Sequence, residues 1–174
     1  MKFFNRLLLL AALFSVVACN KDDDTNAGGD DDIVGVWDLN VLDYTGKSTT
    51  TVSGMPFTAD FMGSARDITA SVEFKSDGTY QSMGTYTIDL TTSLNGQNFT
   101  QAVTITDWLG TGTYMVNGNV ITATDSQAQM PQSIDITKLD GDDLEMDFTF
   151  TQSSNQQGVI STTSIDGNYS FKRR

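Results

Sequence analysis

Residues 114–124 read YMVNGNVITAT, and this stretch decides the fold class. Apolar and polar side chains alternate on both sides of the pair Asn117-Gly118. Both residues of the pair tolerate the positive φ angles that a two-residue hairpin loop requires, so Asn-Gly between alternating runs is a strong hairpin signal. The stretch therefore predicts two antiparallel β-strands joined by a tight turn.

The same period of two continues towards the N-terminus. Residues 68–75 place apolar side chains at every second position, and the turn Ser76-Asp77-Gly78 follows. The return strand keeps its apolar residues at even positions: Tyr80, Tyr86, Ile88 and Leu90. Such alternation is typical of an antiparallel sheet that buries one face.

Two further passes follow towards the C-terminus. The dipeptide Asp140-Gly141 joins residues 134–139 to residues 144–151, where Leu, Met and Phe alternate with polar side chains. A last alternating pass begins at residue 159 and includes Phe171. These runs extend the hairpin pattern almost to the end of the chain.

We therefore expect an all-β domain of about eight to ten antiparallel strands. Residues 55–66 are the ambiguous piece, and they fit either a short helix or a lid. Strands joined by tight turns have to remove their open edges, and closure into an up-and-down barrel does so most simply. A β-sandwich is the alternative.

The first eighteen residues have the three parts of a secretory signal peptide. Lys2 and Arg6 supply the charged region, and residues 7–18 form the apolar core. That core is shorter than the roughly 20 residues that a membrane-spanning helix needs. The chain's single cysteine, Cys19, follows directly.

The sequence around Cys19, Val16-Val17-Ala18-Cys19, resembles the bacterial lipobox. The resemblance implies that the thiol receives a diacylglyceryl group, that cleavage occurs before Cys19, and that the new N-terminus is acylated. Two or more acyl chains give stable membrane anchoring, whereas one gives only marginal binding. The mature protein is thus expected to be tethered to a membrane by its N-terminal lipid.

The residues after the cysteine, Lys21, Asp22, Asp23 and Asp24, resemble the surface-export signal of Bacteroidetes-type lipoproteins. The resemblance implies the outer membrane and an orientation towards the cell surface; the alternative is an acidic linker that merely stays solvated. The linker has almost no apolar residues with which to order itself. We expect a signal peptide at 1–18, the lipidated cysteine and a flexible acidic linker at 19–32, and one folded domain at 33–174.

The composition excludes several classes of function. The formal net charge is −12, which argues against nucleic acid as a partner. The chain has no histidine and one cysteine, so the usual zinc sites and the Ser–His–Asp and Cys–His catalytic sets are excluded. An enzyme would need paired carboxylates, but Asp143, Glu145 and Asp147 alternate towards solvent on one hairpin. We expect no enzyme, no metal and no cofactor.

The domain opens with Gly35-Val36-Trp37, which resembles the first strand of lipocalins. Lipocalins close one end of the barrel with this tryptophan, and a basic side chain near the last strand stacks over it. The resemblance assigns that role to Arg173 or Lys172, together with Gly35. Cation–π stacking of this kind is favourable by roughly 0.5–2 kcal/mol.

Three longer stretches resemble the small lipocalin-like, or calycin-like, domains of Bacteroidetes lipoproteins. They read FKSDGTYQSMGTYTI, GTYMVNGNVITATD and ITKLDGDDLEMDFT. The resemblance implies the fold and a tendency to bind a ligand, without naming one.

Aromatic side chains are the candidates for lining a ligand cavity, since such cavities are mostly apolar with a few polar groups. An eight-stranded barrel is just wide enough either to be filled by them or to hold one small ligand. Trp108 precedes Leu109-Gly110 and is expected on a loop near the barrel mouth, as a binding residue or as a plug. The candidates are Trp37, Tyr80, Tyr86, Trp108, Tyr114, Phe148 and Phe150.

Two functions follow from these expectations. The first is a membrane-anchored module at the cell envelope that binds a small apolar or amphipathic ligand. The second is a structural or interaction protein with a packed barrel, accessory to a larger envelope complex whose members the sequence does not identify.

Overall fold

The computed structural model describes residues 30–106, 108–127, 131–156 and 159–174. One turn of helix, α1 (Asp30–Ile33), precedes the strands, and in the described residues no helix is long and apolar enough to cross a bilayer. The strands are β1 (Gly35–Val52), β2 (Met55–Arg66), β3 (Ser71–Phe74), β4 (Thr79–Met83), β5 (Thr85–Leu94), β6 (Gln97–Thr106), β7 (Thr111–Asn117), β8 (Val120–Asp125), β9 (Pro131–Asp140), β10 (Asp143–Gln156) and β11 (Val159–Arg173).

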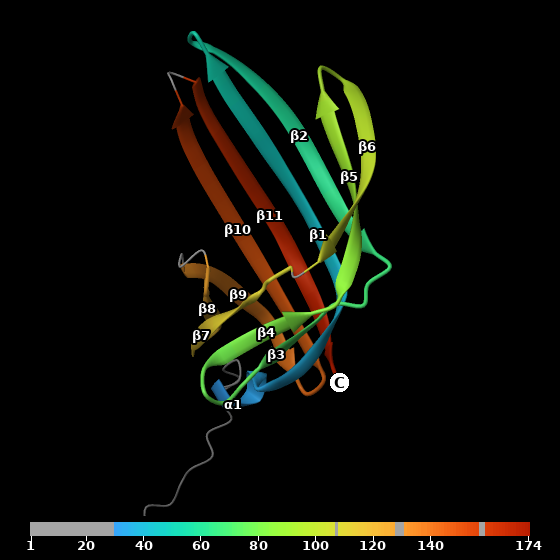
Figure 1. Ribbon diagram of the computed structural model, residues 1–174, viewed down its shortest axis with the longest axis vertical. Coiled ribbons are helices and arrows are strands. Elements are labelled where there is room, and N and C mark those ends of the chain that lie inside the picture. Colours follow the sequence, from blue (N-terminus) through green and yellow to red (C-terminus); the bar gives the residue numbers. More distant parts are fainter. Residues whose placement is uncertain (1–29, 107, 128–130, 157–158) are drawn as a thin grey trace, which may run out of the picture.

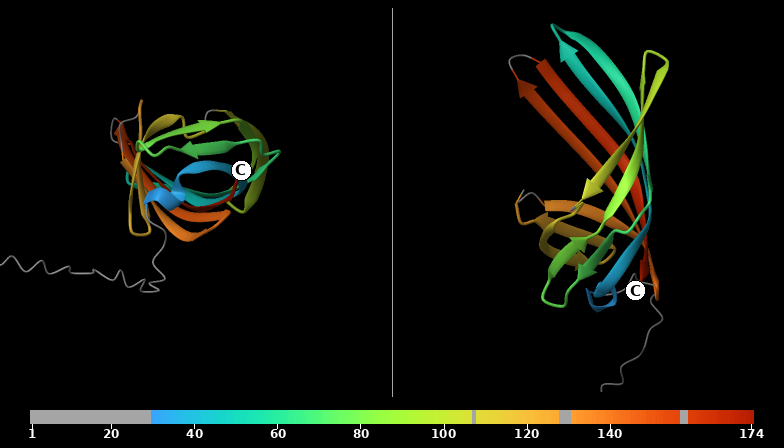
Figure 2. Two further views of the ribbon diagram at one scale, coloured as in Figure 1. Left: turned by 90° about the horizontal axis from the view of Figure 1, so that it is seen from below. Right: turned by 45° about the vertical axis from the view of Figure 1, so that its right-hand side comes forward.

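The strands form one antiparallel sheet that closes on itself, because the last strand, β11, pairs with β1. The closed part is an eight-stranded barrel made of β1, β3, β4, β7, β8, β9, β10 and β11 (Figures 1 and 2). The predicted up-and-down barrel is confirmed, and the sandwich alternative is excluded by this closure.

Three times the chain crosses the sheet as two shorter strands and not as one long strand. The sequence pattern did not predict these interruptions. β2 and β3 both lie along the same edge of β1, and likewise β4 and β5 form one broken pass and β6 and β7 another. The expected continuous return strand breaks at Gly84, whose φ is +82°. A Cβ at Gly84 would overlap the Thr69 carbonyl, so only glycine allows the chain to change direction there.

Residues 55–66 are strand β2, and the prediction of a short helix or a lid was wrong. Their register with β1 runs from Val52↔Met55 to Asp43↔Ser64. A tight turn at Ser53 and Gly54, with φ angles of 52° and 81°, makes this long hairpin possible. The pairing partner decides the structure: β1 is 18 residues long and offers β2 an edge along its whole upper half.

The upper halves of the broken passes join the long strands in an open six-stranded sheet, β10-β11-β1-β2-β5-β6. On the other side of the barrel the wall is low. β9 pairs with β10 only as far as Ile134↔Phe148, while the β10–β11 ladder continues to Gln156↔Val159. The barrel therefore has one high wall and one low wall, and its mouth opens sideways beneath the overhanging sheet (Figure 2).

The lower barrel is packed with side chains. Trp37, Val72, Leu144 and Phe171 are fully buried there. The residual cavity among the core side chains has a volume of about 20 Å³. Such a space holds about one water molecule, so the barrel interior is a core and not a ligand cavity.

Arg173 closes the lower end of the barrel. Its guanidinium lies 4.2 Å from the centroid of the Trp37 ring, and its Nη1 donates to the Val34 carbonyl at 2.8 Å. The indole Nε1 of Trp37 donates to the Ile33 carbonyl at 2.7 Å. Lys172 points outwards and pairs with Asp143, so of the two basic residues Arg173 occupies the position over the tryptophan.

Candidate functional site

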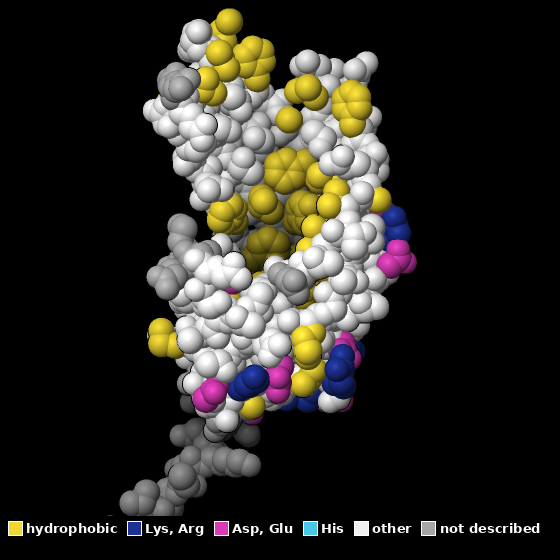
Figure 3. Space-filling model, viewed as in Figure 1, with side chains coloured by type: hydrophobic (Ala, Val, Ile, Leu, Met, Phe, Trp, Pro, Cys, Tyr) yellow, Lys and Arg dark blue, Asp and Glu magenta, His cyan; other side chains and the backbone are white. Residues whose placement is uncertain are grey.

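An apolar hollow of about 390 Å³ lies directly above the packed barrel, on the inner face of the open sheet. In Figure 3, apolar side chains gather at this hollow in the middle of the molecule. Strands β1, β2, β5, β10 and β11 supply its walls. The lining residues are Leu42, Tyr44, Phe61, Tyr86, Leu90, Thr92, Phe148, Ile165 and Tyr169.

Glycines on neighbouring strands leave room for three aromatic rings of the hollow to lie across them. Tyr44 lies opposite Gly63, and Phe61 lies opposite Gly46. A Cβ on either glycine would overlap the ring that crosses it. The same arrangement places Phe148 across Gly167. Because glycine has no side chain, each ring can occupy the space over the neighbouring strand.

Trp108 forms the boundary between the hollow and the barrel core. Its ring stacks on Phe171 at 6.1 Å and contacts Tyr86 and Tyr169 edgewise or tilted at 6.1 and 5.8 Å. The next residue, Leu109, accepts a hydrogen bond from the Tyr80 hydroxyl at 3.3 Å. The loop that carries Trp108 thus crosses the barrel mouth as a plug. The Trp108 Nε1 is buried and has no hydrogen-bond partner in the described part of the chain.

Three tyrosine hydroxyls belong to the hollow: those of Tyr44, Tyr86 and Tyr169. None of them donates a hydrogen bond to another described residue. Burial, with a smaller contribution from Tyr44, raises the pKa of Tyr86 to about 12. Burial also raises the pKa of Tyr44 and of Tyr169 above the ordinary value. All three hydroxyls are therefore neutral at physiological pH and can both donate and accept.

The structure distributes the predicted ligand-binding residues over two regions. Tyr86 and Phe148 line the hollow, and Phe150 lies on the same inner face, opposite Ile165. Trp108 lies beneath the hollow as its plug. The other three residues lie inside the packed barrel and do not reach the hollow: Trp37, Tyr80 and Tyr114.

Sequence reasoning missed most of the hollow. Tyr44 and Phe61 lie on the long β1–β2 hairpin. Their position in the hollow depends on the pairing of β1 with β2, which the sequence pattern did not predict. Leu90 and Ile165 had a signal, because each continues the alternation of a strand that was recognised. The glycines opposite the rings could not be found, since their pairing depends on the register.

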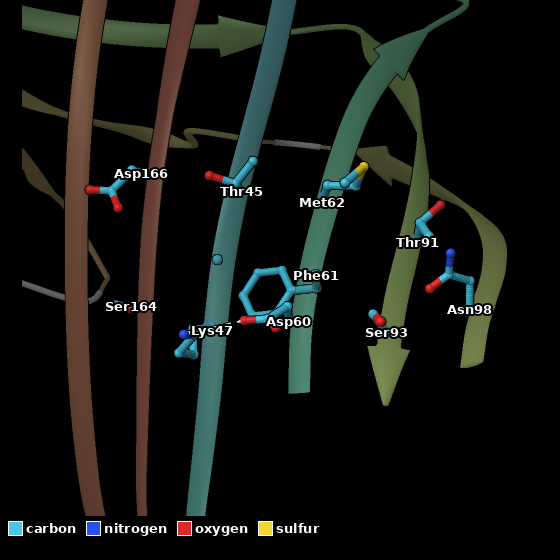
Figure 4. Close-up of a pocket in the computed structure, with 11 residues that line it drawn as sticks. Thr45, Lys47, Asp60, Phe61, Met62, Thr91, Ser93, Asn98, Ser164 and Asp166 are labelled. Carbon is cyan, nitrogen blue, oxygen red and sulfur yellow. Dashed lines mark ion pairs between the residues drawn. The ribbon is translucent and has the colours of Figure 1, made fainter. Parts of the chain in front are cut away.

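A second depression, of about 610 Å³, lies on the outer face of the same sheet (Figure 4). Its lining combines Phe61 and Met62 with many polar side chains, among them Asp60, Asn98 and Asp166. Lys47 and Asp60 approach to 3.6 Å there, but their side chains are 60% and 65% exposed, and such an ion pair contributes little. Ligand sites are concave and mostly apolar, so the inner hollow is the better candidate.

The predicted lipidation residue Cys19 and the export residues Lys21, Asp22, Asp23 and Asp24 lie outside the described residues. In the described ranges no three acidic, cysteine or histidine side chains come together in a group that could hold a metal ion.

Comparison with known proteins identifies no relative of this chain. No protein-family model matches it, and neither a curated protein nor a solved structure does. The assignment of function therefore depends on the geometry of the hollow.

Proposed function

We propose that this protein is a binding module for a small apolar or amphipathic molecule, and that the molecule binds in the hollow above the barrel. The supporting observation is the contrast in free volume: about 390 Å³ in the hollow against about 20 Å³ in the barrel. A volume of this size falls within the range of small-molecule pockets, roughly 300–1,000 Å³. The aromatic lining supplies apolar contact area, and the tyrosine hydroxyls supply the polar groups.

The two tryptophans give a direct test of binding in the hollow. Trp108 contacts Tyr86 and Tyr169, which line the hollow, whereas Trp37 lies at the closed end. In a Trp37→Phe variant, the emission of Trp108 should change saturably when an amphipathic probe such as octyl glucoside is added. Native mass spectrometry of the protein from its own host should show a small adduct that is lost on unfolding.

A pair of matched variants locates the site. Leu90→Arg places a charge in the hollow and should abolish the fluorescence response. Thr91→Arg places the same charge on the outer face, where Thr91 lines the second depression, and should leave the response intact. An apo mass together with no response from Trp108 would contradict the proposal, as would equal effects of the two substitutions.

We also propose that the protein is a lipid-anchored envelope protein, with Cys19 acylated and the folded domain facing the cell surface. The lipobox-like sequence and the Lys-Asp-Asp-Asp run support this assignment. Metabolic labelling with an alkyne fatty acid should mark the wild type and not Cys19→Ser. Protease added to intact cells should digest the wild type, whereas replacing Asp22–Asp24 by alanine should protect it without removing the label.

A second candidate is a structural or interaction protein, and the exposed apolar residues at the hairpin tips favour it. Met55, Phe57 and Phe99 are 61%, 57% and 59% exposed at the far end of the sheet. Contiguous exposed apolar surface marks contact sites for partners. Substituting Phe57 and Phe99 with serine separates the candidates, since a docking role loses a partner while a binding role keeps the Trp108 response.

A further inference from the structure

Among the described residues, the inner face of the six-stranded sheet carries no Asp, Glu, Lys or Arg side chain. Asp43, Lys47, Asp60, Asp89 and Asp166 occupy the positions that alternate with the hollow-lining ones, and all line the outer-face depressions. Three long stretches of the sequence contain no charged residue: 48–59, 90–106 and 148–165. On the face shown in Figure 3, charged side chains cluster around the barrel.

This absence of charge restricts the ligand. A charged group that enters an apolar hollow without a counterion loses its hydration and gains no partner, which is strongly unfavourable. The net charge of the chain is −12, yet no acidic residue is among the described residues that line the hollow. The part of a ligand that contacts this face has to be neutral.

Above the hollow, β1, β10 and β11 carry hydroxyl-bearing and amide side chains on the inner face, while β2 and β6 add Phe57 and Phe99 there. The Ser48 and Thr163 hydroxyls lie 3.2 Å apart, and those of Thr50 and Ser161 lie 3.3 Å apart. Thr92 lines the hollow itself. Each hydroxyl can donate once and accept twice, so one cross-strand bond leaves capacity for a ligand. We call Ser48, Thr50, Thr92, Ser161 and Thr163 the hydroxyl band.

The band begins close to the hollow. Ile165 lines the hollow and Thr163 is the next residue on the same face of β11, a step of roughly 6.6 Å. A molecule with its apolar chain on the aromatic floor would therefore place its head on the band. The neutral hydroxyls of Tyr44, Tyr86 and Tyr169 offer further donors within the hollow, with Tyr86 and Tyr169 at its barrel end beside Trp108.

We infer that the ligand of the hollow is an uncharged amphipath with a polyhydroxyl head, in the chemical class of alkyl glycosides. Its chain lies on the aromatic floor and its head binds the hydroxyl band. The inference rests on the proposed function and adds to it the chemistry of the head group.

Four eight-carbon probes that differ only in the head group test the inference by titration calorimetry below their micellar concentrations. The probes are octyl glucoside, octyl sulfate, octyltrimethylammonium and 1-octanol. We expect octyl glucoside to bind at least tenfold more tightly than either charged probe and more tightly than 1-octanol. Equal or tighter binding of a charged probe overturns the inference, and so does equal binding of 1-octanol, although the proposed function survives both results. Failure of all four probes overturns the proposed function as well.

A matched pair of double variants tests the role of the band. Ser48→Ala/Thr163→Val removes a hydroxyl pair from the inner face and should weaken octyl glucoside by roughly threefold to tenfold while leaving 1-octanol unchanged. Thr49→Ala/Thr58→Ala removes a comparable pair, 3.1 Å apart, that lies outside the hydroxyl band. It should change neither affinity. A loss of 1-octanol binding in the first variant, or an unchanged glucoside affinity, overturns the assignment of the head group to the band.

Discussion

In the barrel, the Tyr80 hydroxyl donates to the Leu109 carbonyl and the Tyr114 hydroxyl donates to the Lys75 carbonyl at 2.8 Å. In the hollow, the hydroxyls of three other tyrosines have no such bond among the described residues. Glycines do not separate the two groups, since Tyr44 lies across Gly63 in the hollow and Tyr80 lies across Gly112 in the barrel. Tyrosine is thus a hydrogen-bonded core residue in the barrel and a lining residue in the hollow. What distinguishes them is whether a backbone carbonyl lies within reach of the tyrosine hydroxyl.

The largest expected difference between the two regions is the cost of removing an aromatic ring. Phe171 is fully buried, and Phe171→Ala should reduce the free energy of unfolding by roughly 3–5 kcal/mol. Phe148 lies half-buried on the neighbouring strand, so Phe148→Ala should cost less than half as much. Urea denaturation measures both. Equal costs would mean that the hollow is part of the core, and the comparison would fail.

Loss of Arg173 should lower the stability of the barrel without changing the hollow, which would sharpen the comparison between the two regions. Arg173→Ala removes the cation–π contact and hydrogen bonds to the carbonyls of Val34 and Gly141, with an expected cost of about 2 kcal/mol. Arg173→Lys keeps the charge but loses the planar fork, so it should recover only part of this stability. Probe binding in the hollow should not change in either variant. A change in binding would show that the two regions are coupled.

A methyl group at Gly63 should affect the hollow and spare the barrel. In Gly63→Ala the Tyr44 ring has to move away from the sheet, at an expected cost of about 1 kcal/mol, and it then occupies the space of a ligand. Octyl glucoside should bind less tightly. In a Tyr44→Ala background, Gly63→Ala should cost no further stability, since the clash is absent. If Gly63→Ala alone left both stability and binding unchanged, the position of the Tyr44 ring over Gly63 would not be what keeps the hollow open.

The smallest effect is expected from alkaline pH. The pKa of Tyr86 is about 12 in the folded protein, against 10.0 for a free tyrosine. A raised pKa of an acid means that the unfolded chain loses its proton first, so stability is constant below pH 10 and falls as the pH rises from 10 towards 12. Absorbance at 295 nm should show Tyr86 ionising late, and Tyr86→Phe should remove that transition. A Tyr86 that ionised near pH 10 would mean that water enters the hollow freely.

The barrel could be predicted from the sequence because its turns and the alternation of its strands are determined by residues that are close together in the chain. Asn117-Gly118 and Asp140-Gly141 both end strands in the structure, as their turn chemistry requires. The hollow could not be predicted, because it depends on three non-local features. Gly63 matters only in register with Tyr44, and the break at Gly84 depends on the nearby Thr69 carbonyl. The third feature is the shortness of β8 and β9, which matters only against the length of β10 and β11.

The closure of the barrel by its first and last strands also determines how long one edge of β1 stays unpaired during synthesis. Ser48 and Thr163, which bond across that seam, lie 115 residues apart in the chain. At a synthesis rate of roughly 5–20 residues per second, the edge of β1 waits on the order of 6 to 20 s for its partner. An unpaired edge of this length is a template for strands of other chains. The 15 residues of β11 therefore decide whether a newly made chain completes its barrel or aggregates.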